Sequence, residues 1–156
     1  MGQRLWPWAL GLLAWQCGSI LLGAGEYVYD LPATPIVVVA SSVTALGWLA
    51  LAAWSGLRQL RAFPVVAAFV WGLTIASLLV VAMLRPWEGG AVDAWRGLFL
   101  LPLLFGAGPL HGLGSLLPAG DQTQRTLLVA GTLLALSLAT HHVALRAGQK
   151  SPVDLR

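Results

Sequence analysis

The feature that most constrains this chain is a series of apolar blocks, each about as long as a bilayer is thick. A helix rises 1.5 Å per residue, so roughly twenty apolar residues cross the ~30 Å hydrocarbon core. Five such blocks follow one another, separated by short connections that contain glycine, proline or charge. They predict an all-α, polytopic transmembrane helical bundle, and they cover residues 5–24, 35–54, 65–84, 98–118 and 127–146.

The composition indicates the same class of protein. Of the 156 residues, 58% are hydrophobic and only 10% are charged. A soluble domain carries about a quarter charged residues, and this chain has too few to cover a surface that faces water. We therefore expect one transmembrane domain over residues 1–146, followed by a polar C-terminal tail at 147–156, with the lipid bilayer as its surroundings.

The net charge does not indicate a nucleic-acid partner. The formal charge of +3 comes from nine Lys and Arg against six Asp and Glu. The basic residues stand one or two per connection and form no patch. In a membrane protein they orient the chain, because Lys and Arg collect on the cytoplasmic side. We expect a plasma (inner) membrane protein with a cytoplasmic N-terminus.

The fourth block contains a stretch of helix-breaking residues. Residues 105–114, FGAGPLHGLG, hold four glycines, a proline and a histidine. Proline inside a helix costs about 3 kcal/mol unless a kink absorbs it, and irregular backbone at membrane depth must be covered by protein or face a water-filled cavity. Two arrangements stay open: a kinked helix that crosses fully, which we put first because of its apolar length, or a re-entrant pair of half-helices.

The distribution of basic residues separates these two arrangements. Five crossings place four Lys and Arg inside and five outside, which gives no bias. Four crossings with a re-entrant fourth segment place six inside and three outside. The second count agrees better with the rule that basic residues stay inside.

Three histidines are weak candidates for cofactor binding, because ionisable residues inside a membrane are costly to bury and often functional. His111 lies in the broken segment, and His141 and His142 lie near the end of the fifth block. Two histidines on different helices can ligate a haem. In a five-crossing chain, however, His111 and His141 differ in depth by ~13 Å. No cofactor is therefore expected, and haem stays a lesser alternative.

Each candidate residue also has a plain structural interpretation. His111 can bond a carbonyl that Pro109 frees, and the histidines of the fifth block can extend toward the interface beside an arginine. The broken segment is the predicted kinked-helix contact or substrate site, carried by Gly108, Pro109, His111 and Gly112. Acidic and basic loop residues, otherwise simply solvated, are the predicted outer-face contacts: Glu26, Asp30 and Arg96.

The sequence contains no recognisable catalytic or metal-binding motif, so we predict no catalytic or metal-ligating residues and do not expect an enzyme. Small residues spaced for helix contacts, such as Gly131, Ala135 and Ala139, indicate that helices pack together here. Our first hypothesis is a non-catalytic accessory subunit of a larger membrane complex. The second is a small homo-oligomeric transporter or channel that uses the broken segment. The third is a redox subunit that contacts haem or quinone.

Overall fold

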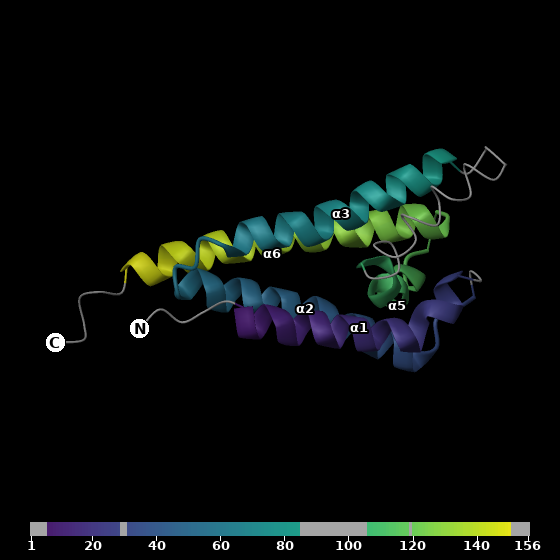
Figure 1. Cartoon of the computed structure of the whole chain (residues 1–156), viewed down its shortest axis with the longest axis horizontal. Helices are drawn as coiled ribbons and strands as arrows, with labels where there is room; N and C mark the ends of the chain where they lie inside the picture. The colour runs from purple at the N-terminus through teal and green to yellow at the C-terminus, as the bar shows by residue number, and fades with distance from the viewer. Residues whose placement is uncertain (1–5, 29–30, 85–105, 119, 151–156) are drawn as a thin grey trace.

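The computed structural model describes residues 6–28, 31–84, 106–118 and 120–150, and everything that follows refers to these residues. They form only helices and connections, which confirms the predicted all-α class. Helices are labelled as in Figure 1. Their bounds are α1 Trp6–Val28, α2 Pro35–Leu57, α3 Phe63–Leu84, the 3₁₀ helix η1 Gly108–Leu110, α5 His111–Ser115 and α6 Gln122–Lys150.

Three of the described helices are long and apolar enough to cross a membrane. The qualifying stretches are Pro35–Leu57, Phe63–Met83 and Gln122–Gln149. Helix α1 has 23 residues, and its described part holds a shorter apolar stretch, Leu10–Leu21. These lengths agree with an integral membrane protein, because a helix satisfies its own backbone hydrogen bonds where no water is present.

The four long helices form two pairs (Figure 1). Helices α1 and α2 run antiparallel in one pair, and α3 and α6 run antiparallel in the other. The pairs meet where α2 and α6 end, and they diverge toward the opposite end of the bundle. Glycines permit the close approach: a Cβ on Gly56 would collide with the backbone of His141, and one on Gly148 would lie 3.0 Å from Leu57 O.

Aromatic side chains fill the core between the pairs. Trp48 of α2 meets Trp71 of α3 edge to face, with ring centroids 5.3 Å apart, and Phe63 lies 6.4 Å from Trp48. All three side chains are fully buried. Each buries a large apolar area, and the tilted geometry suits the ring quadrupoles.

Two indole hydrogen bonds connect α1 to α2. Trp15 Nε1 donates to Thr44 Oγ1 at 3.1 Å, and Trp48 Nε1 donates to Gln16 Oε1 at 3.3 Å. Polar side chains inside a membrane bundle are satisfied across helices in this way.

The predicted fourth segment is described only in its second half. Residues 106–118 form η1, the five-residue α5 and a turn, not a long kinked helix, while residues 98–105 lie outside the described part. Helix α3 ends and α6 begins at the same end of the bundle, and α5 fills the space between the diverging pairs (Figure 1). Because α3 and α6 run in opposite directions, the chain between them starts and finishes at one end.

Helix α6 begins at Gln122, five residues before the apolar block predicted at 127. Asp121 Oδ1 accepts from the N–H of Gln124 at 2.8 Å, and Gln124 Oε1 lies 3.3 Å from the N–H of Asp121. This reciprocal capping box satisfies the free N–H groups at the start of a helix. Gly120, with φ of +93°, turns the chain just before it.

Candidate functional site

The described part of the fourth segment, residues 106–118, touches both helix pairs through glycines. The N–H of Gly112 donates to Ser41 Oγ of α2 at 3.0 Å. A Cβ on Gly112 would lie 2.6 Å from that oxygen and 2.6 Å from the Cα of Val38, and a Cβ on Gly106 would collide with Thr74 of α3. Only glycine lets the segment enter this space without displacing its neighbours.

His111 is buried at the centre of this segment, with 5% of its surface exposed. Its Nε2 lies 3.0 Å from the carbonyl oxygen of Leu31 in the α1–α2 connection. A carbonyl oxygen only accepts, so Nε2 carries a proton and donates this hydrogen bond. The ring meets Tyr27 edge to face, with centroids 5.7 Å apart. The carbonyl therefore belongs to a distant connection and is not one that Pro109 frees.

Tyr27 joins the ends of α1 and α6 beside this histidine. It lies beyond the apolar stretch of α1, and burial raises the pKa of its phenol to about 12, although a hydrogen bond with Thr126 opposes the rise. The hydroxyl therefore keeps its proton at neutral pH. Gln122 Nε2 donates to the carbonyl of Tyr27 at 2.6 Å, so the start of α6 is tied to the end of α1.

A polar cavity of about 480 Å³ lies against the same segment. The α1–α2 connection, α5 and the first turns of α6 enclose it, and its polar lining side chains are His111, Ser115, Gln122, Arg125 and Thr126. The buried Nε of Arg125 has no hydrogen-bond partner within the described residues. A buried donor without a partner carries a free-energy penalty of about 1–3 kcal/mol.

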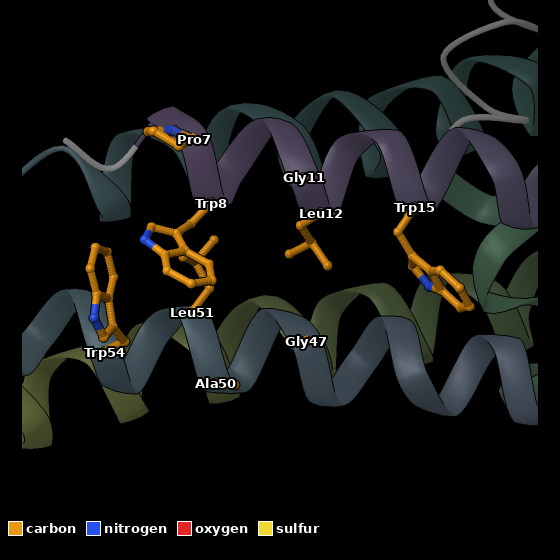
Figure 2. A pocket seen from close by; sticks show the side chains of 9 residues that line it. All are labelled: Pro7, Trp8, Gly11, Leu12, Trp15, Gly47, Ala50, Leu51 and Trp54. Atoms are coloured by element: carbon orange, nitrogen blue, oxygen red, sulfur yellow. The ribbon is translucent and has the colours of Figure 1, made fainter.

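A second, apolar groove of about 660 Å³ lies between α1 and α2, away from the histidines. Figure 2 shows Trp8, Leu12 and Trp15 pointing from α1 toward α2, while Trp54 points back from α2. The rings of Trp8 and Trp54 are 5.7 Å apart. The lining is almost entirely hydrophobic, and Gly11 and Gly47 lie along it.

His141 belongs to a different part of the bundle. Its Nδ1 lies 2.9 Å from Ser55 Oγ, and its ring stacks on Phe63 with centroids 5.1 Å apart. The Ser55 hydroxyl donates to the carbonyl of Ala52, which leaves the Nδ1–H of His141 as the donor to Ser55. His142, the next residue, is exposed.

The structure does not bring the two buried histidines together. His111 precedes Gly112, which bonds to Ser41 of α2, whereas His141 contacts Ser55 of the same helix. Ser41 and Ser55 are 14 residues apart, which is ~21 Å along α2. Within the described residues, no three His, Cys, Asp or Glu side chains gather where they could hold a metal ion.

The remaining predicted residues divide between the site and the connections. Pro109 is fully buried beside His111, and Gly108 is also buried, although a Cβ there would meet no atom within 4 Å. Glu26 Oε2 accepts from the N–H of Thr34 at 3.0 Å, so this carboxylate holds the start of α2 in place. Two predicted outer contacts lie outside the described residues: Asp30 and Arg96.

No protein-family model, curated protein or solved structure matches this chain. The candidate site therefore stands on its own geometry. Sequence reasoning did not include Ser41, Tyr27 or Arg125 in it. Of these three, only Arg125 is indicated by the sequence, because it is a basic residue close to the start of an apolar block. Such residues were expected only to orient the chain in the membrane.

Proposed function

We propose that this protein is a non-catalytic subunit that packs against the helices of other membrane proteins. The observation that carries the proposal concerns glycines that internal packing does not need. A Cβ would meet no heavy atom within 4 Å at Gly11, Gly18, Gly72 or Gly131, unlike at Gly56. Small residues at helix surfaces let a second backbone approach closely, which is how helices associate in lipid.

These glycines belong to small-residue faces on separate helices. On α1, Ala14 is exposed between Gly11 and Gly18, and the three lie on one side of the helix. On α6, Ala135 and Ala139 are exposed in line with Gly131. The groove in Figure 2 extends beside Gly11. A partner helix that lies along α1 would place its side chains in that groove.

The topology that we propose has four crossings and a re-entrant fourth segment, with both termini in the cytoplasm. It is supported by the common end at which α3 finishes and α6 starts (Figure 1). The basic residues agree, with six inside and three outside. Those inside are Arg4, Arg58, Arg61, Arg146, Lys150 and Arg156, and those outside are Arg85, Arg96 and Arg125.

The decisive experiment is recovery of the tagged chain from its native membrane in mild detergent, followed by native mass spectrometry. We expect other membrane proteins in fixed ratio. Gly18→Leu and Ala135→Leu should each reduce that recovery while the chain itself stays folded, because both positions face outward. Val39→Leu is the matched control, since it adds bulk to an exposed position on α2. Recovery of the chain alone, or as a homo-oligomer, contradicts the proposal.

A second candidate function is a small homo-oligomeric transporter or channel. The observation that favours it is the burial of residues 106–112 between both helix pairs, beside a polar cavity. This function predicts K⁺, Na⁺ or Cl⁻ flux into vesicles that contain the purified chain. His111→Ala should abolish the flux and His142→Ala should not. Flux no greater than that of empty vesicles, or flux unchanged in His111→Ala, rejects it.

A further inference from the structure

Among the described residues, the polar cavity beside α5 has a cation in its lining but no acidic side chain. That cation is Arg125, and no other Lys or Arg lines the cavity in the part of the chain that the structure describes. Arg125 also lies in the first turn of α6, where the helix dipole is already positive. An anion in the cavity would offset both the charge of the side chain and the helix dipole.

The nearest acidic side chains of the described residues are engaged elsewhere. Glu26 accepts from the backbone of Thr34, and Asp121 accepts from the backbone of Gln124. The stem of Arg125 packs over Gly114, where an added Cβ would lie 3.7 Å from the Cβ of the arginine. The arginine is therefore held against α5, beside the cavity.

An apolar groove of about 390 Å³ lies next to this cavity. The two spaces share Leu116, and the groove then follows α6 past Leu128, Thr132 and Leu136. These positions follow Arg125 at intervals of three or four residues, so they form one stripe on the helix. The groove therefore leads from the charged end of α6 toward the middle of the membrane-spanning helix.

We propose that α2, α5 and α6 bind an anionic phospholipid, with its phosphate at Arg125 and one acyl chain in the groove. The cavity supplies a cation for a charged head group, and the groove supplies an apolar surface for an acyl chain. A free anion would use only the first, and an uncharged lipid only the second. The site is separate from the small-residue face of α1, and the test below uses the purified chain without a partner subunit.

The test is a titration of lipid-depleted protein, followed by native mass spectrometry, with phosphatidylglycerol, phosphatidylcholine of the same chains, and inorganic phosphate. Phosphatidylglycerol should bind most tightly, because choline's own cation competes with the arginine. Arg125→Gln should weaken its binding at least about tenfold, the amount expected for one hydrogen bond to a charged group. Thr132→Phe, which fills the groove, should also weaken it.

Matched controls separate binding from folding. Arg146→Gln removes an exposed arginine at the other end of α6 and should leave lipid binding unchanged. Arg125→Lys retains a cation and should retain part of the preference. Equal binding of both lipids, or an Arg125→Gln variant that still prefers phosphatidylglycerol, overturns the proposal. So does binding of inorganic phosphate that equals that of the lipid and is insensitive to Thr132→Phe, which would identify a free-anion site.

Discussion

The N–H of Gly112 donates to the hydroxyl of Ser41 at 3.0 Å, and this contact joins α5 to α2 across 71 residues of sequence. The backbone of one element here meets a side chain of the other with no room for a Cβ between them. In lipid, where helices gain little from apolar burial against one another, such close backbone contacts and hydrogen bonds are what hold a bundle together. The position of α5 depends on them.

Gly112→Ala should destabilise the fold. The new methyl group would overlap the backbone of α2 at Val37 and Val38, and forcing it in should cost about 1–3 kcal/mol in the free energy of unfolding. Gly108→Ala is the matched control, because a Cβ there meets no atom within 4 Å. Unfolding in detergent, followed by tryptophan fluorescence, measures both. Equal stabilities of the two variants would show that α5 does not sit against α2.

The hydrogen bond between His141 and Ser55 should contribute measurably to stability. A double-mutant cycle with Ser55→Ala and His141→Phe should give a coupling energy of about 0.6 kcal/mol, the average for buried side-chain hydrogen bonds in membrane proteins. His142→Phe paired with Ser55→Ala should give none, because His142 is exposed. A coupling energy near zero for the first pair would mean that the two side chains do not interact.

The re-entrant topology predicts which positions share a side of the membrane. In a Cys17→Ser background, which removes the single cysteine, we expect Gln59→Cys and Gln149→Cys to react with an impermeant thiol reagent from the cytoplasmic side. Thr34→Cys should react only from the opposite side. All three positions are exposed. A full crossing by the fourth segment would instead place Gln149→Cys on the same side as Thr34→Cys.

The capping box at Asp121 should determine where α6 begins. Asp121→Ala removes the acceptor for the N–H of Gln124 and should cost about 0.5–2 kcal/mol in the free energy of unfolding. Amide hydrogen exchange at residues 122–125 should quicken as the first turn frays. Asp121→Asn, which keeps a side-chain oxygen at the cap, should behave nearly as the wild type. Unchanged exchange in the alanine variant would show that the helix start is held by other contacts.

The sequence by itself determined the class of protein and the position of the irregular segment. Twenty-residue apolar blocks predict helices, because a chain in lipid must satisfy its backbone hydrogen bonds within itself. The glycines and proline around His111 predict a break for an equally local reason, since Pro109 lacks an N–H and restricts the chain before it. Both inferences depend only on neighbouring residues, and both agree with the helices described here.

Only the tertiary structure decided how the broken segment is used. Helix α3 ends and α6 begins at the same end of the bundle, and α5 lies between the two helix pairs (Figure 1). His111 is held by the carbonyl of Leu31, 80 residues earlier in the chain. The cavity beside Arg125 likewise needs three separate elements to enclose it. Hydrophobic periodicity reports burial but not which helix lies opposite, so partners this distant in sequence become known only when the helices are placed in space.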